Sequence, residues 1–378
     1  MMNMLFKGAI TATLLVASAL VHSTLSVTDL AGRTVTLERP AQRVILGEGR
    51  FISLFSVLQI ENPMQRIVGM MADLKRFDPA SYAAYRKAFP EIEQIDLFGN
   101  TSEDSVSLDK ILLLKPDLAI FGLAGHGPGA KSTHIVQRLE KAGIPIVFID
   151  FRQSPIKNTA HSVEIVGTLL GKQSRAKAFA DLYQSQLQLI AERVKGLTTE
   201  QYPTVLFDLR ASADQACCLS VAQGLFAEMA QFTGGKSLAS GLLPGPVGQL
   251  SYEHILSTQF DVYIGTAIGS GLQSPEQSPF LLSGPNVTPE LARRSLSLFL
   301  KARKFEKLPA IKAGRAYSLW HHFYNSAFNL YAIESMAKWF HPTLFADLQP
   351  QKTLDELLSG AAPADLSGAY SISVEQTR

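Results

Sequence analysis

Short apolar runs recur along the chain and alternate with longer segments in which apolar residues come at three- and four-residue steps. The short runs predict buried strands and the stepped segments predict helices. Their alternation is typical of parallel sheets with crossover helices, so the sequence predicts an α/β fold. The predicted strands are Arg43–Gly47, Asp117–Gly122, Ile144–Phe151, Thr204–Leu209, Asp261–Gly265 and Ala316–Trp320.

The longest helical pattern lies in the middle of the chain and contains no glycine or proline. Gly171 is suited to end the helix before it, and Gly196 is suited to end this one. We therefore expect one continuous helix from about Arg175 to Lys195, which would act as a stiff spacer. Its apolar positions are Phe179, Leu182, Tyr183, Leu187, Ile190 and Val194.

One sequence pattern occurs twice. The segments SLDKILLLKPDLAI (Ser107–Ile120) and SYEHILSTQFDVYI (Ser251–Ile264) share five identical positions, and Asp109 in the first matches Glu253 in the second. Each reads as a serine N-cap, a short helix with an acid in its first turn, and then a buried strand. The copies start 251 − 107 = 144 residues apart, which is about one domain length. The repeat predicts two similar, Rossmann-like α/β lobes with a ligand cleft between them.

The chain therefore divides into an N-terminal α/β lobe at 27–157, a helical segment with the inter-lobe helix at 158–196, and a C-terminal α/β lobe at 197–378. Residues 1–23 precede the first lobe. They carry one positive charge (Lys7) and an apolar run that is short for a membrane span, which predicts a cleavable signal peptide. With no cysteine near the cleavage site, we expect a periplasmic protein that is not a lipoprotein and has no stable membrane insertion.

Composition excludes several classes of protein. Hydrophobic residues make up 46% of the chain and charged residues 18%, which supports a large core and argues against disorder. A formal charge of +2 gives no reason to expect nucleic-acid or membrane-surface binding. No H-E-x-x-H or G-x-S-x-G motif is present, so the remaining enzyme alternative is a secreted metal-dependent hydrolase centred on His321 and His322.

The two cysteines of the chain are neighbours, Cys217 and Cys218. Consecutive Cα atoms about 3.8 Å apart are closer than the usual disulfide range. We expect two buried thiols, with a disulfide between adjacent residues as the open alternative.

Polar and basic residues gather where the predicted strands end. In parallel sheets, ligands bind outside the carboxyl ends of the strands, so these residues predict a cleft that favours an anionic ligand. The predicted ligand-binding residues are Gly49, Arg50, His126, Arg152, Arg210, Thr266, Trp320, His321, His322 and Tyr324.

The stretch WHHFYN (Trp320–Asn325) concentrates the candidate metal ligands. We expect a cleft loop before a helix that starts near Ser326, with Asn325 or Ser326 as its N-cap. Adjacent side chains rarely point the same way, so only one histidine, His322, should face inward with Tyr324, while Trp320 packs beneath or stacks on the ligand. The alternative is a structural cluster with Trp320 in the core and solvated histidines.

Several segments resemble the periplasmic binding proteins of iron-siderophore, haem and cobalamin ABC importers. They include DLAGRTVTLERPAQRVI, LLLKPDLAIFG, LEKAGIPIVFID and LPAIKAGRAYSL, and the likeness runs from about Val27 to about Leu358. The resemblance implies two lobes on one rigid helix, only modest closure on binding, and partnership with an ABC permease and its ATPase. It also implies a permease-docking carboxylate on each lobe, here Asp109 and Glu253, or the nearby Glu103 and Glu91. Alternatively, Asp109 and Glu253 only oppose helix dipoles.

Within this family, a ferric siderophore or related anionic metal complex suits an arginine-rich cleft best, because arginine forks bind its oxygens. Tyr324 or His322 could complete the shell of the iron. A haem could use the same residues as an axial ligand, and a compact oxyanion such as molybdate remains an alternative. We expect a monomer that holds no cofactor beyond a bound ferric chelate.

Overall fold

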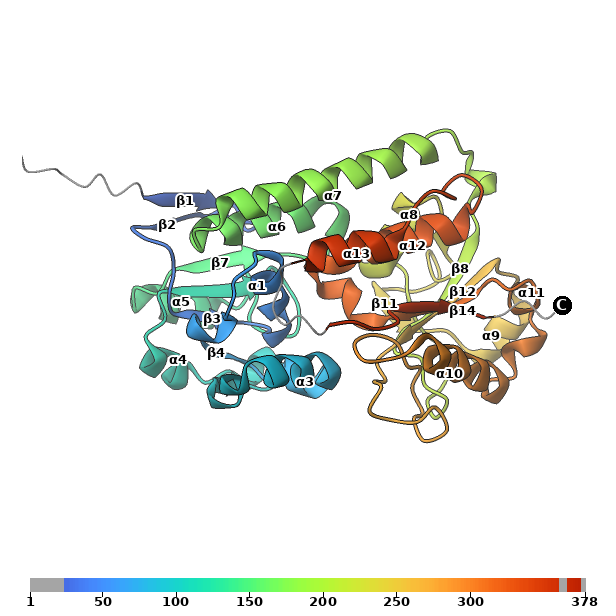
Figure 1. Cartoon of the computed structure of the whole chain (residues 1–378), viewed down its shortest axis with the longest axis horizontal. Coiled ribbons are helices and arrows are strands. Elements are labelled where there is room, and N and C mark those ends of the chain that lie inside the picture. The colour runs from blue at the N-terminus through green and yellow to red at the C-terminus, as the bar shows by residue number, and fades with distance from the viewer. Residues whose placement is uncertain (1–23, 360–365, 375–378) are drawn as a thin grey trace, which may run out of the picture.

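The computed structural model describes residues 24–359 and 366–374, so the predicted signal peptide lies outside the described residues. Two α/β lobes stand side by side, and the helix α7 (Gln173–Val194) runs along one side of both (Figure 1). The predicted fold class is confirmed.

The N-terminal lobe is built on a five-stranded sheet in the order β5-β4-β3-β6-β7, in which every neighbouring pair is parallel. This is a doubly wound order, and its topological switch point lies between β3 and β6. The strands are β3 (Val44–Leu46), β4 (Ile67–Met71), β5 (Asp96–Gly99), β6 (Leu118–Gly122) and β7 (Ile146–Ile149).

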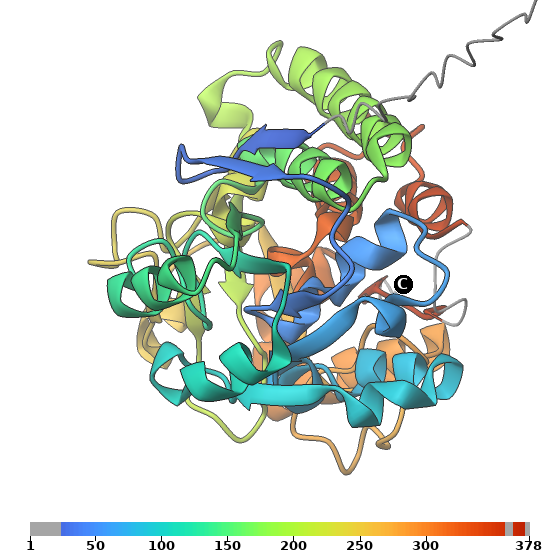
Figure 2. The ribbon, with the colours of Figure 1, turned by 90° about the vertical axis from the view of Figure 1, so that its left-hand side faces the viewer.

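Five helices belong to the N-terminal lobe, together with an antiparallel hairpin at its start. The helices are α1 (Ser53–Val57), α2 (Asp73–Phe77), α3 (Pro79–Ala88), α4 (Leu108–Leu114) and α5 (Thr133–Lys141). The hairpin strands β1 (Leu25–Thr28) and β2 (Thr34–Leu37) lie beside helix α6 (Pro155–Leu169), as Figure 2 shows from the end of this lobe.

The C-terminal lobe is built on a second sheet, in the order β10-β8-β12-β13-β14. Its first four strands are parallel and β14 is antiparallel to β13. The switch point here lies between β8 and β12. The strands are β8 (Thr204–Asp208), β10 (Lys236–Ser237), β12 (Val262–Ala267), β13 (Ala316–Trp320) and β14 (Ser371–Ser373).

Six helices and a small two-stranded sheet surround the second sheet. The helices are α8 (Leu225–Phe232), α9 (Tyr252–Ser257), α10 (Pro289–Ala302), α11 (Pro309–Lys312), α12 (Leu330–Phe340) and α13 (Pro350–Leu358). The small sheet pairs β9 (Leu219–Val221) with β11 (Val247–Gln249). Within the described ranges, no helix is both long and apolar enough to cross a membrane.

All six predicted strands are present, as β3, β6, β7, β8, β12 and β13. They form the middle of the two sheets, where burial on both faces gives continuous apolar runs. The segments that the pattern missed include β5 and β10, which lie at sheet edges, and β4, whose run is interrupted by Gly69.

The two lobes share one hydrophobic core, which joins residues of both sheets through α6, α7, α8 and α12. The predicted helix is α7, which begins two residues before Arg175. Near one end of α7, Arg175 Nε donates to the Val57 carbonyl of the N-terminal lobe at 2.9 Å. At the other end, Arg193 pairs with Asp347 of the C-terminal lobe at 2.6 Å. The helix is therefore anchored in both lobes.

The repeated segments have the predicted local structure. The side chain of Ser107 accepts a hydrogen bond from Lys110 N at 3.4 Å at the start of α4, and Ser251 accepts one from His254 N at 3.1 Å at the start of α9. The two helices precede β6 and β12, which occupy central positions in their sheets. Asp109 and Glu253 are both exposed in the first turns of these helices.

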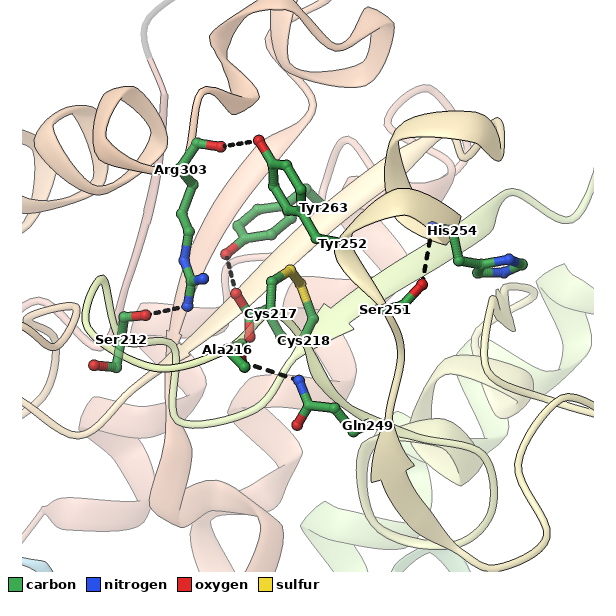
Figure 3. Close-up of a disulfide and its surroundings, with 11 residues drawn as sticks. Ser212, Ala216, Cys217, Cys218, Gln249, Ser251, Tyr252, His254, Tyr263 and Arg303 are labelled. Carbon is green, nitrogen blue, oxygen red and sulfur yellow. Dashed lines mark hydrogen bonds between the residues drawn. A yellow bond between two sulfur atoms is a disulfide. The ribbon is translucent and has the colours of Figure 1, made fainter.

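The expectation of two free thiols is wrong, because Cys217 and Cys218 form a disulfide (Figure 3). The peptide between them is cis, and their Cα atoms lie 3.1 Å apart. Both residues are buried in the loop between β8 and β9. Gln249 Nε2 donates to the Ala216 carbonyl at 2.9 Å and fixes this loop to β11.

Candidate ligand-binding site

A cleft of about 810 Å³ lies between the lobes and is bordered by residues of both. Its walls include residues that directly follow β8 and β13, together with His126 from the loop after β6. This is the place where doubly wound sheets bind ligands, and the volume is in the usual range for small-molecule sites.

Seven of the ten predicted ligand-binding residues line the cleft, and three do not. Those that line it are Arg50, His126, Arg152, Arg210, His321, His322 and Tyr324. Gly49, Thr266 and Trp320 do not line the cleft, and Thr266 and Trp320 each contact a histidine that does.

These three residues make different contacts. A Cβ on Gly49 would lie 2.6 Å from the Met71 carbonyl oxygen, so only glycine fits there. The Thr266 hydroxyl accepts from Arg210 N at 2.7 Å and contacts His321 Nδ1 at 2.9 Å. The Trp320 ring packs edge-on against His322, with centroids 5.2 Å apart.

The phenol oxygen of Tyr324 is the meeting point of the two lobes at the bottom of the cleft. It accepts hydrogen bonds from Arg50 Nη1 at 2.8 Å and Arg152 Nη2 at 3.3 Å. His126 Nε2 lies 3.2 Å from the same oxygen. Three basic side chains of the N-terminal lobe thus surround one oxygen of the C-terminal lobe.

Arg50 is held by two buried carboxylates. Its Nε donates to Asp73 at 2.8 Å and its Nη2 to Glu48 at 2.9 Å, and both acids are almost inaccessible to solvent. Burial raises the pKa of Asp73 above its usual value, an effect that the charge of Arg50 only partly opposes. The guanidinium is therefore fixed in position before any ligand arrives.

Glu48 is a site residue that the sequence analysis passed over, although it stands two positions before Arg50. Its Oε2 accepts from Asn325 Nδ2 at 2.7 Å and from Arg152 Nη2 at 3.3 Å, in addition to Arg50. Burial alone would raise the pKa of Glu48, but the charges of Arg152 and Arg50 outweigh burial and lower the pKa below its usual value. Glu48 is therefore an ionised carboxylate that joins the lobes.

Both histidines of the pair line the cleft, whereas the sequence suggested that only one would. Burial, together with nearby positive charge, lowers the pKa of His321 and of His322 well below the usual value, so both are neutral at pH 7. Burial and the charge of Arg152 lower the pKa of His126 to about 4. The cleft therefore offers three neutral imidazoles.

The local backbone explains how these side chains reach the cleft. His321–Asn325 form one 3-10 turn directly after β13, and Ala327–Asn329 form a second. Ser326 caps the second turn by accepting from Phe328 N at 3.1 Å, so the predicted cap is present. The α-helix itself begins later than predicted, at Leu330.

The C-terminal lobe adds an apolar wall that the sequence analysis did not identify. Two of its residues are exposed, Leu272 at 73% and Val247 at 38%. On the opposite lobe, Arg76 of α2 also lines the cleft. The apolar lining from the C-terminal lobe includes Leu209, Leu219, Phe226, Val247, Ile268, Leu272 and Phe280.

Among the residues that the structure describes, no three His, Cys, Asp or Glu side chains of the cleft bring their ligand atoms within 4.8 Å of one another. Among the described residues, one group of three His, Cys, Asp or Glu side chains brings its ligand atoms within 4.8 Å of one another. It consists of Asp208 and the two bonded cysteines, which do not line the cleft.

Comparison with known proteins identifies the family. A family model described as periplasmic binding protein matches residues 77–320, more than half of the chain. The chain therefore belongs to the periplasmic binding protein family.

Solved structures of the same fold cover nearly the whole chain. The TroA-like periplasmic binding protein FepB of Veillonella parvula superposes with a TM-score of 0.81 at 22% identity, covering 93% of this chain and all of that one. The molybdate-binding protein MolA of Haemophilus influenzae gives 0.65 at 14% identity, covering 91% and 99%. A periplasmic haem-binding protein of Pseudomonas aeruginosa gives 0.52 at 15% identity, covering 80% and 94%. These likenesses show the fold alone.

A curated relative matches in part. The uncharacterized ABC transporter substrate-binding lipoprotein YvrC of Bacillus subtilis is 24% identical over 124 residues, which cover 33% of this chain and only 37% of that relative. The family and the structural neighbours are solute-binding transport proteins, and the family implies a periplasmic location.

Proposed function

We propose that this protein captures a ferric chelate, such as a ferric siderophore, and delivers it to an inner-membrane ABC permease. The observation that carries the proposal is the Tyr324 phenol oxygen, which two arginines and a histidine hold at the base of the inter-lobe cleft. A phenol oxygen in a basic surrounding suits a hard cation that arrives with an anionic chelator.

The donor set favours a chelate over a bare ion. Tyr324 and His322 each offer one ligand atom, and the cleft has room for a chelator that supplies the remaining donors. The two carboxylates at this point are already engaged, Glu48 with Arg50, Arg152 and Asn325, and Asp73 with Arg50. The protein side chains would therefore complete an iron shell that the chelator mostly fills.

We assign Asp109 and Glu253 to docking on the permease. Both are exposed, and they occupy matching positions in the two repeated segments, so one lies on each lobe. We further propose that the protein works as a periplasmic monomer without a lipid anchor and that the permease is driven by an ATPase.

Haem is the second candidate. The apolar wall that includes Phe226 and Leu272 would suit a macrocycle, and Tyr324 could serve as an axial ligand. A compact oxyanion fits less well, because it would leave most of the cleft and its apolar wall without a contact.

The visible spectrum tests the proposal. We expect protein purified from iron-limited cells to carry iron and to show the charge-transfer band of a ferric chelate. The variants Tyr324→Phe, His321→Ala and His322→Ala identify the ligand atom, with Tyr202→Phe outside the cleft as the matched control. A band shift in Tyr324→Phe indicates phenolate ligation, and loss of affinity without a shift indicates hydrogen bonding. An iron-free, colourless protein that binds no ferric chelate would contradict the proposal, and a haem spectrum would select the second candidate.

A further inference from the structure

The arginines of the cleft differ in whether their charge is neutralised. Arg50 and Arg152 both pair with Glu48, and Arg50 pairs with Asp73 as well. Arg76 and Arg210 also line the cleft and are exposed. Across residues 24–359 and 366–374, neither of these two guanidinium groups has a hydrogen-bond or ion-pair partner. The uncompensated positive charge therefore lies at the exposed rim of the cleft and not at its base.

Arg50 has no free edge for a ligand. Its Nε is bonded to Asp73 at 2.8 Å, its Nη2 to Glu48 at 2.9 Å and its Nη1 to Tyr324 at 2.8 Å. Both edges of the planar fork that could bind a carboxylate are thus occupied. Arg50 is a positioning residue, which holds the Tyr324 oxygen in place.

The two rim arginines approach the cleft from opposite lobes. Arg76 belongs to α2 of the N-terminal lobe, and Arg210 follows β8 of the C-terminal lobe. Arg210 has φ +52°, a left-handed conformation that is unfavourable for an arginine. Its N–H is held by the Thr266 hydroxyl at 2.7 Å. A residue kept in such a conformation beside a cleft is typical of a functional position.

The cleft that these arginines line also has an apolar wall, which needs an apolar surface of the ligand to cover it. Leu272 is 73% exposed at the mouth of the cleft, and Val247 is 38% exposed. A hydrophilic ligand would leave these side chains in water, whereas an aryl or aliphatic surface would bury them.

We infer that the ligand is an amphipathic chelate with an apolar body and peripheral carboxylates. Its body lies against the wall of the C-terminal lobe, its metal centre faces Tyr324, and its carboxylates pair with Arg76 and Arg210 at the rim. The inference rests on the proposed function only in taking the ligand to be an iron chelate.

Three ferric complexes separate these features. Ferric 3,4-dihydroxybenzoate has aryl rings with a carboxylate that points away from the iron, ferric catechol has the same iron donors without the carboxylate, and ferric citrate has no apolar body. Affinity is measured by quenching of the intrinsic tryptophan fluorescence, since Trp320 packs against His322 of the cleft. We expect the carboxylated aryl complex to bind about tenfold more tightly than ferric catechol, as one charge-assisted contact would give, and ferric citrate to bind most weakly.

The variants Arg76→Gln and Arg210→Gln assign the carboxylate contacts. Each should weaken ferric 3,4-dihydroxybenzoate about tenfold and leave ferric catechol unchanged, because only the first complex carries the group that the arginine would bind. Arg138→Gln, at an exposed arginine of α5 outside the cleft, controls for the loss of one positive charge. Circular dichroism and thermal unfolding confirm that each variant is folded.

The outcomes for this inference and for the proposed function differ. Equal binding of ferric citrate and the aryl complexes would overturn the apolar body while leaving an iron-chelate carrier in place. Equal weakening of ferric catechol and ferric 3,4-dihydroxybenzoate in the arginine variants would overturn the carboxylate contacts. A protein that carries iron from cells but binds none of the three complexes would also overturn the inference, and the proposed function would stand.

Discussion

The two lobes shift the pKa of a buried carboxyl group in opposite directions. Glu48 follows β3 in the N-terminal lobe and Asp208 ends β8 in the C-terminal lobe, so both lie at the switch point of their sheet, and both are almost completely buried. The charges of Arg152 and Arg50 overcome burial and lower the pKa of Glu48. Burial raises the pKa of Asp208 to about 7, because its hydrogen-bond partner is the neutral Tyr263 hydroxyl and Arg303 only partly opposes the effect.

Equivalent places in two similar folds therefore hold different kinds of group. The N-terminal lobe keeps an ionised, hydrogen-bonded network that faces the cleft. The C-terminal lobe keeps a carboxyl that is partly protonated near neutral pH and lies beside its disulfide. The difference lies in the neighbouring arginines and not in the depth of burial.

Removing the carboxylate of the N-terminal lobe should have the largest effect. Glu48→Gln leaves Arg50 and Arg152 with less compensation in a buried site, and we expect a loss of about 3–5 kcal/mol in the free energy of unfolding. Urea unfolding at pH 7 measures this loss. Glu253→Gln, at an exposed position, is the control and should change stability by less than about 0.5 kcal/mol. A loss as small as that of the control would mean that Glu48 does not neutralise the arginines.

Asp208 of the C-terminal lobe should make the folded protein less stable as pH rises. A carboxylate with a lowered pKa, such as Glu48, has the reverse effect. The pKa of Asp208 is about 7 in the folded protein. Its unfolded value is about 4, so wild-type stability falls relative to Asp208→Asn as pH rises from about 4 to about 7, by up to about 1.4 kcal/mol per pH unit. Chemical unfolding of both proteins at pH 4, 5.5, 7 and 8 measures the difference. A constant difference across this range would show that Asp208 has an ordinary pKa.

The smallest change should be in the relative placement of the lobes. Because α7 is anchored in both lobes and the core is continuous between them, small-angle scattering with and without a bound ferric chelate should give nearly the same radius of gyration. A large compaction on binding would show that the lobes move independently. The difference between Glu48 and Asp208 described above would then apply to only one arrangement of the lobes.

The middle of each sheet could be predicted from the sequence, because strands buried on both faces leave continuous apolar runs. The same rule led to Arg152, Arg210 and the His321–Tyr324 turn, since each follows such a strand. Arg76 was missed because it follows β4, whose apolar run contains a glycine and was not recognised as a strand.

Glu48 and Asp73 were missed for a different reason. A basic cleft predicted from single residues gives no sign that buried carboxylates neutralise part of its charge. That depends on which side chains meet in space, and the contacts of Arg50 with Asp73 and of Arg152 with Glu48 join residues 23 and 104 positions apart. The apolar wall contributed by Leu272 comes from irregular chain, where periodicity carries no information.

The contacts between the end of the chain and the first lobe have a consequence for the order of folding. Gln59 Nε2 of the N-terminal lobe donates to the Ser359 carbonyl at 2.7 Å, and Glu48 is completed by Asn325. The first lobe is synthesised early, but it lacks these partners until nearly the whole chain is available. Contacts over such sequence separations slow folding, so we expect a nascent chain that stays incompletely folded until its last segments emerge. The family implies a periplasmic location, and late completion of the fold would suit a chain that has to cross a membrane to reach it.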